Sequence, residues 1–224
     1  VCLGIALLSS MAITPATAQL NGEEFLVELD PGGDAELSMT FVYDLASDDE
    51  RAAFEELREN TTAQTEMVDR FENRMTAVAE DTSAATDREM SVSSVSMELE
   101  RGDDAGLVVV SLQWANLAAV EDNHLTVTEP FASGFEPGMA FTLVAPGEYG
   151  IVSATPEPAS SQQRSATWER DTTLENFEVV VEPRSEETDS GETADGTPEG
   201  DATEESPGLG IVTALVALVA ALLA

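Results

Sequence analysis

The residues Leu107-Val108-Val109-Val110-Ser111-Leu112-Gln113-Trp114 carry the clearest hydrophobic pattern in the chain. Every second residue is large and apolar: Val108, Val110, Leu112 and Trp114. Because successive side chains of a β-strand point to opposite faces, this alternation predicts a strand with one buried face. One strand of a half-buried sheet is therefore expected here.

The segment that leads into this strand has the same alternation with one break. Met90 and Val92 share one parity, whereas the apolar residues between 95 and 99 share the other. A β-bulge near Ser93-Ser94 would let both sets face the core, because a bulge adds one residue to one strand. Arg101-Gly102-Asp103-Asp104 then predicts a turn into the next strand.

A hairpin is also expected near the start of the domain, where residues 25–29 and 37–43 alternate around the tight turn Asp30-Pro31-Gly32-Gly33-Asp34. Further short strands are predicted at Leu125–Thr128, Met139–Val144, Tyr149–Ala154, Thr167-Trp168 and Phe177–Val181. Strands at this spacing, separated by Pro/Gly turns, indicate a β-sandwich.

Helical periodicity interrupts the strands once. Ser47-Asp48-Asp49-Glu50 is a capping-box sequence with Ser47 as the N-cap and Glu50 at N3, so it predicts the start of a helix. A second helix places one stripe of apolar residues together: Met67, Phe71, Met75 and Val78. Such a stripe would also suit a soft ligand pocket or a partner helix, but a helix that packs on a sheet buries the same stripe, and we interpret it as core. The expected fold class is α+β, a mainly antiparallel β-sandwich with a helical hairpin inserted at about residues 47–85.

The first 18 residues carry no charge and contain the apolar run Cys2-Leu3-Gly4-Ile5-Ala6-Leu7-Leu8. Ala16-Thr17-Ala18 follows as an A-x-A cleavage signature, so residues 1–18 are predicted to be a signal helix cleaved between Ala18 and Gln19. Cys2, the only cysteine, would leave with it. No basic residues precede the run and Val1 is not methionine, so we expect the true start to lie upstream.

Residues 207–224 form a second uncharged end. The apolar stretch from Leu209 would make roughly 24 Å of helix against a hydrocarbon core of about 30 Å, which predicts a hydrophobic helix that anchors the chain in a membrane. Pro207-Gly208-Leu209 and this helix resemble the archaeal sorting signal called PGF-CTERM, with Leu209 in place of Phe and no basic residue at the end. The resemblance implies a surface protein whose tail an archaeosortase exchanges for a lipid.

Acidic residues are spread over the rest of the chain, which has 44 Asp plus Glu, nine Arg, no Lys and a net charge of −35. Nine of the acids fall in residues 185–206, a segment too poor in apolar residues to fold, which predicts an extended disordered stalk. The predicted extracytoplasmic domain at 19–184 carries the other 35 acids. A nucleic-acid partner is excluded, because phosphate binding needs clusters of basic residues. Acidity spread so evenly resembles that of proteins from salt-loving archaea, because molar salt screens the self-repulsion.

Three short motifs in the domain support a further resemblance: Trp114-Ala115-Asn116-Leu117-Ala118, Pro146-Gly147-Glu148-Tyr149 and Thr167-Trp168. They are similar to a haloarchaeal extracytoplasmic domain of unknown function, which in some relatives precedes a membrane segment and a cytoplasmic winged helix. The resemblance covers nearly all of the globular part and implies no catalytic residues. The winged helix is missing from this chain, so a one-component transcriptional sensor is not indicated.

Motifs for catalysis are absent from the sequence. His124 is the sole histidine, and nothing resembles a zinc-protease helix, a phosphate-binding loop or a nucleophile elbow. Calcium is the metal ion that the sequence suits best, with the loop carboxylates Asp103, Asp104, Glu121 and Asp122 as candidate ligands, although solvated acidic surface explains each cluster better. Asn60-Thr61-Thr62 is the one glycosylation sequon, placed between the predicted helices.

The function expected from these patterns is that of a non-enzymatic, membrane-anchored cell-surface protein of a halophilic archaeon. It would need no cofactor, and its partner would be an envelope protein or a glycan. The alternative is an anchored extracytoplasmic enzyme or solute-binding protein, whose pocket no sequence motif reveals. A deep apolar cleft would favour the alternative, whereas a filled interior would favour the first hypothesis.

Overall fold

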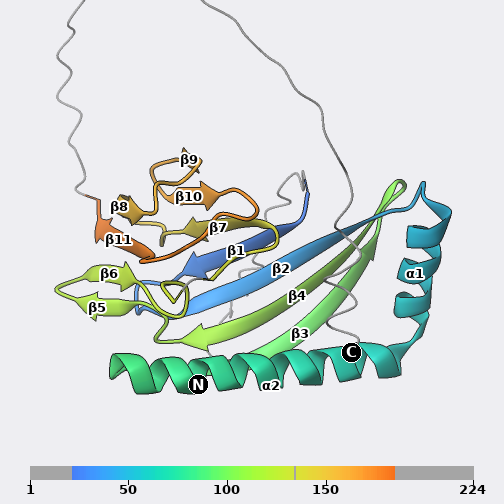
Figure 1. Cartoon of the computed structure of the whole chain (residues 1–224), viewed down its shortest axis with the longest axis horizontal. Helices are drawn as coiled ribbons and strands as arrows, with labels where there is room; N and C mark the ends of the chain where they lie inside the picture. The colour runs from blue at the N-terminus through green and yellow to red at the C-terminus, as the bar shows by residue number, and fades with distance from the viewer. Residues whose placement is uncertain (1–21, 134, 185–224) are drawn as a thin grey trace, which may run out of the picture.

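A computed structural model describes residues 22–133 and 135–184 (Figure 1). The predicted signal peptide with its cleavage site at Ala18–Gln19, the acidic stalk, and the C-terminal anchor with its motif Pro207, Gly208 and Leu209 lie outside the described residues. None of the helices in the described ranges combines the length and the apolar character needed to cross a membrane.

The described residues form two helices and eleven strands, and the helices are inserted after the second strand as the sequence predicts, whereas the short strands at Ala119–Glu121 and Ser160–Ser161 are not predicted. In chain order they are β1 (Glu24–Leu29), β2 (Ala35–Asp44), α1 (Asp48–Glu59), α2 (Thr61–Thr86), β3 (Ser91–Arg101), β4 (Ala105–Ala115), β5 (Ala119–Glu121), β6 (His124–Val127), β7 (Ala140–Val144), β8 (Tyr149–Thr155), β9 (Ser160–Ser161), β10 (Ser165–Trp168) and β11 (Glu178–Pro183). The α+β class is therefore confirmed.

The strands make two sheets. The larger has the order β3-β4-β2-β1-β7-β10-β9, and the smaller has the order β5-β6-β11-β8. All neighbours are antiparallel except β1 and β7, which run parallel with Phe25 opposite Phe141. The larger sheet is therefore mixed, a departure from the local hairpins that the sequence predicts.

Strand β4 lies between β2 and β3, where its alternating residues have partners on both sides. Val110 is opposite Met39 of β2 and opposite Met97 of β3. The predicted bulge in β3 is confirmed, because the register shifts between Ser93 and Ser96 and Ser94 has a φ of 55°. The bulge restores the inward parity, so that apolar residues on both sides of it face the same layer.

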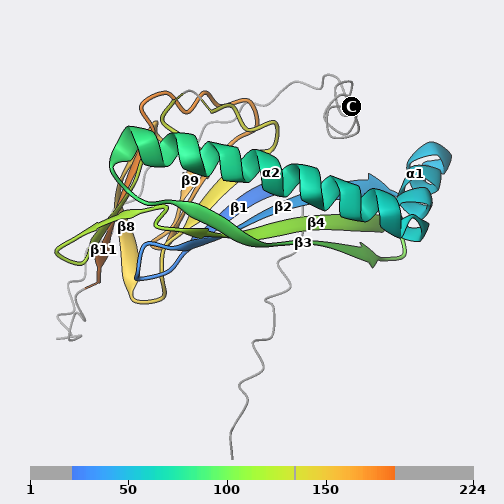
Figure 2. The ribbon, with the colours of Figure 1, turned by 90° about the horizontal axis from the view of Figure 1, so that it is seen from below.

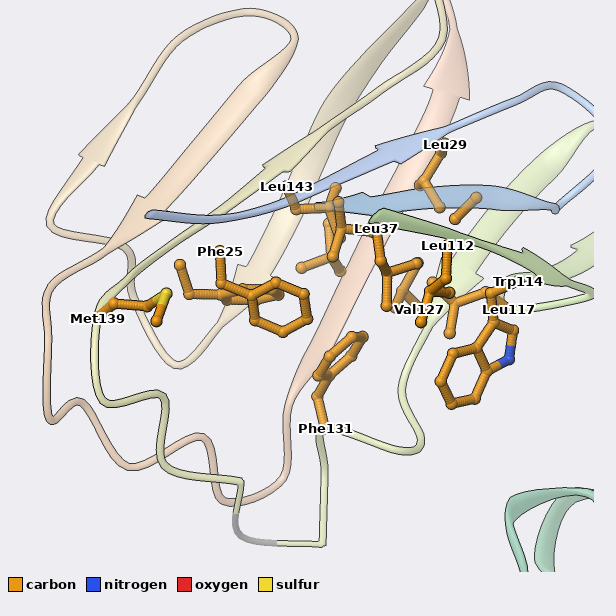
Figure 3. Close-up of a cluster of buried hydrophobic side chains, with 14 of the residues drawn as sticks. Phe25, Leu29, Leu37, Leu112, Trp114, Leu117, Val127, Phe131, Met139 and Leu143 are labelled. Carbon is orange, nitrogen blue, oxygen red and sulfur yellow. The ribbon is translucent and has the colours of Figure 1, made fainter. Parts of the chain in front are cut away.

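One face of the larger sheet is apolar, and two different layers cover it. The smaller sheet and its flanking segments cover what we call the strand-covered half, where Phe177 packs on Phe141 and Trp168 with ring centroids 5.7 and 5.1 Å apart. Figure 3 shows Val127 of β6 beside Leu37 and Leu112 in the same core.

The long helix α2 covers the remaining part, which we call the helix-covered half. Figure 2 shows α2 lying lengthwise over the sheet, along β3 and β4. Its buried residues Met67 and Phe71 face Phe41, Val108 and Val110 of the sheet. The apolar stripe predicted for this helix thus faces the sheet.

The helical insertion differs from its prediction in two details. Helix α1 begins at Asp48 as expected, but the Ser47 side chain makes no capping bond, and the Glu50 carboxylate accepts from the Asp44 amide at 2.7 Å. The predicted capping box is therefore wrong in its bonding, because Glu50 reaches past the N-cap to the end of β2. The two helices also diverge from Asn60 instead of folding back as a hairpin (Figure 1).

Candidate functional site

The two layers that cover the sheet leave an apolar groove between them, with a volume of about 310 Å³. Its floor comes from β1, β2 and β4, and its walls come from α2 on one side and Phe135 on the other. The lining residues are Phe25, Leu37, Met39, Phe41, Phe71, Arg74, Met75, Val110, Leu112 and Phe135. This volume lies at the lower end of the range for small-molecule sites, about 300–1,000 Å³.

The wall opposite α2 is held by interlocking aromatic rings. Phe135 contacts Phe25 edge-on, with centroids 5.8 Å apart, and Phe131 with centroids 5.7 Å apart. Its carbonyl also accepts a hydrogen bond from the Leu174 amide at 3.1 Å. Figure 3 shows Phe131 directed at Phe25 from the segment that follows β6. This wall is therefore well anchored.

The wall made by α2 is packed more loosely. A second hollow of about 30 Å³ continues under the helix and shares four lining residues with the groove: Met39, Phe41, Phe71 and Val110. A third, of about 200 Å³, follows towards Asn60 and shares Tyr43, Leu57 and Met67 with the second. Methionine supplies much of this lining, and its unbranched side chain adapts to different neighbours. The underside of α2 can therefore adjust to a guest.

Arg74 is the only charged residue that lines the groove, and it lies at the exposed mouth. Within residues 22–133 and 135–184 it is also the only arginine whose guanidinium makes no ion pair or hydrogen bond. Four arginines pair with carboxylates: Arg51, Arg58, Arg101 and Arg170. The other four donate to backbone carbonyls: Arg70, Arg88, Arg164 and Arg184.

Two ionisable groups near one end of β1 and β2 have shifted pKa values. Burial raises the pKa of the Glu23 carboxyl, although Arg170, whose Nη2 lies 2.9 Å from it, acts in the opposite direction. Burial also raises the pKa of the Tyr43 hydroxyl, and the nearby Glu50 adds to the effect. Neither group lines the main groove, whose walls offer carbon, sulfur and one guanidinium. This surface suits the binding of an apolar chain better than acid–base chemistry.

The structure does not bring the calcium candidates together. Asp103 and Asp104 lie in the turn between β3 and β4, and Glu121 and Asp122 lie at the turn between β5 and β6. The length of β4 separates the two pairs, and all four residues are exposed. Across the two described ranges, no three His, Cys, Asp or Glu side chains gather in a way that could hold a metal ion.

The remaining candidates lie away from the main groove. His124 is exposed at the start of β6, with Nε2 4.0 Å from Glu182. Asn60 is exposed between α1 and α2, where its Oδ1 accepts from the Ala63 amide at 3.0 Å and caps α2. Trp114 and Trp168, which belong to two of the motifs that support the resemblance, are buried in the core.

The Met and Phe stripe of α2 suits a soft ligand pocket or a partner helix as well as core, and the interpretation as core, which the sequence favours, does not predict the groove that Phe71 and Met75 line. One signal does lie in the sequence, since Arg74 directly precedes Met75 of that stripe. A charge beside an apolar stripe is common on surface helices, so this signal is weak on its own.

A family model described as "Domain of unknown function (DUF7345)" matches residues 26–157, more than half of the chain. The match extends from β1 to just beyond β8, so it contains both helices and every residue of the groove except Phe25. No curated protein is significantly similar to the chain.

Proposed function

The chain belongs to the DUF7345 family, whose description assigns no activity, and from this premise we propose that it is a membrane-anchored cell-surface protein that binds an apolar ligand in the groove under α2. The groove is the observation that carries the proposal. An apolar hollow of this size on a protein surface typically marks a binding site.

The setting of the domain is proposed from the ends of the chain. Residues 1–18 act as a signal peptide, residues 185–206 as a stalk, and residues 207–224 as an anchor or an archaeosortase signal. The domain between them faces the outside of a halophilic archaeal cell. There, dense carboxylates keep its surface hydrated while salt screens their repulsion.

A binding role is favoured over the two other roles considered. An enzyme of acid–base type needs polar groups that converge on a reacting atom, and Arg74 is the one polar side chain in the lining. A glycan needs several hydrogen-bonding partners, which this lining does not supply. Of the alternative hypothesis, an anchored enzyme or a solute-binding protein, we therefore adopt the solute-binding protein, and we propose that its ligand is apolar.

The test uses a neutral photoreactive chain, an alkyl alcohol that carries a diazirine, added to the full chain in lipid nanodiscs. Met75→Trp fills the groove from the half-buried wall of α2, and Asn73→Trp places the same ring on an exposed position on the outer side of the same helix. Excess bulk in a filled site costs about 1–3 kcal/mol, so labelling of the domain by Met75→Trp is expected to fall about tenfold or more.

The matched variant Asn73→Trp is expected to keep the wild-type level of labelling, because position 73 lies on the side of α2 that faces away from the groove. Circular dichroism of both variants shows whether α2 stays folded. Equal labelling of the domain in the wild type and in a folded Met75→Trp would overturn the proposal.

A further inference from the structure

We propose that the ligand of the groove is an anionic single-chain amphiphile, whose head group binds Arg74 at the mouth and whose tail lies under α2. The inference rests on the proposed function and adds the chemical class of the ligand. It joins two observations that are independent of each other, the unpartnered guanidinium and the direction in which the hollows continue.

The lack of an ion-pair partner for Arg74 is unusual in so acidic a domain. The domain carries 35 acids against nine arginines, yet no carboxylate of the described residues lies within 4.0 Å of this guanidinium. A guanidinium at the edge of an apolar surface offers a fork of donors that fits a carboxylate or a phosphate. The charge at the mouth is thus complementary to an anion, although the domain as a whole is strongly negative.

Arg70 strengthens the positive charge at this point of the helix. It lies four residues before Arg74, and residues at this spacing are neighbours on one side of a helix. Its Nε donates to the Glu66 carbonyl at 3.2 Å, and none of its nitrogen atoms forms an ion pair with a described carboxylate. Two like charges at i and i+4 repel each other, so an anionic head between them would relieve that repulsion.

The opposite wall contributes Phe135 and no charged side chain to the lining. Glu136 follows Phe135 directly and is exposed, and its carboxylate accepts a hydrogen bond from the Thr173 hydroxyl at 3.2 Å. Among the described residues, the one charge in the lining therefore comes from Arg74 on the side of α2. An anionic head is directed to the helix side.

The path proposed for the apolar tail of the ligand follows from the order of the hollows along α2. The groove of about 310 Å³ borders the hollow of about 30 Å³ at the residues that the two share, of which Phe71 lies one turn before Arg74 on α2. A straight chain that starts at Arg74 passes Phe71 and continues between α2 and the sheet towards Met67. One unbranched tail suits so small a second hollow, and the methionines that line it can move to make room for the tail.

The experiment compares two photoreactive probes of equal length, a diazirine fatty acid and the corresponding alcohol, on the full chain in nanodiscs of neutral lipid. Hydrogen bonds to a charged group contribute more than neutral ones, so the acid is expected to label the groove at about tenfold lower concentration than the alcohol. Peptide mapping is expected to place the label in α2 and β2. The preference should decrease as salt rises, because Arg74 is exposed.

Arg74→Gln is expected to abolish the preference for the acid while the alcohol labels as before, and Arg70→Gln to reduce it. Arg58→Gln removes an equal charge from α1 and should leave the preference unchanged.

Three outcomes separate the failures. Equal labelling of the groove by acid and alcohol would overturn the anionic ligand and leave the proposed function intact. Label in residues 207–224 alone, or in no part of the groove, would overturn both. An acid preference that survives Arg74→Gln would overturn the assignment of the head group to Arg74.

Discussion

The two halves of the apolar sheet face differ in how their covering layers fit. In the strand-covered half, Phe141, Trp168 and Phe177 are at most 1% exposed, and their rings interlock. In the helix-covered half, Met67 and Phe71 remain 8% and 7% exposed, and hollows run beneath them. The helix α2 is cylindrical and presents methionine side chains to the sheet, so it fills the space above the sheet less completely than interlocking aromatic rings do. The groove is the space that remains between α2 and the sheet.

The largest expected effect is on the strand-covered half. Phe141→Ala removes a ring that contacts five other aromatic rings, those of Phe25, Phe131, Phe135, Trp168 and Phe177. Because the neighbours cannot close the cavity, the free energy of unfolding is expected to fall by about 3–5 kcal/mol. Urea unfolding of the full chain measures it, and a loss below about 1 kcal/mol would show that this half is not tightly packed.

Substitutions that enlarge a buried side chain should distinguish the two halves by the stability that each variant loses. Val127→Leu inserts a methylene at a fully buried position of β6 and is expected to destabilise the domain by about 1–3 kcal/mol. Val110→Leu adds the same volume at a position that borders both the groove and the smaller hollow, so the cost should stay below about 1 kcal/mol. Equal losses in the two variants would contradict the difference in packing.

The smallest expected effect is a pH dependence near Glu23, whose partner Arg170 follows β10. The pKa of the Glu23 carboxyl is raised above 4.5, so the folded protein holds its proton more tightly than the unfolded chain. Stability is therefore lost as pH rises through the window from 4.5 to the folded pKa. In Glu23→Gln the melting temperature should no longer fall with pH across this window. In Glu24→Gln the fall should remain, because Glu23 is intact. An unchanged slope in Glu23→Gln would assign it to another group.

Much of the sheet could be predicted from local pattern. Alternation identified β4 through Val108 and Val110, and a change of parity located the bulge at Ser94. The parallel pairing of β1 with β7 could not be predicted, because Phe25 and Phe141 are far apart in the chain and the sequence of a strand does not show which strand pairs with it. Periodicity reports which side of a strand is buried, and it does not report what covers that side.

The sequence could offer the candidate site only as an alternative to core, for a related reason. The stripe that contains Met67 and Phe71 shows that α2 has an apolar face, but the quality of fit depends on a sheet formed by other segments. Arg74 is one of nine arginines, and only the structure shows that its guanidinium alone has no partner among the described residues. The acid clusters were visible in the sequence, yet the fold keeps Asp103 and Glu121 apart.

The most direct test of the central claim is the position of the label that a neutral diazirine alcohol leaves on the wild-type full chain. If the groove under α2 binds an apolar ligand, the labelled peptides of the domain will come from α2 and β2, around Phe71, Met75 and Met39. Label in the domain that avoids these peptides, or that falls only in residues 207–224, would contradict the account.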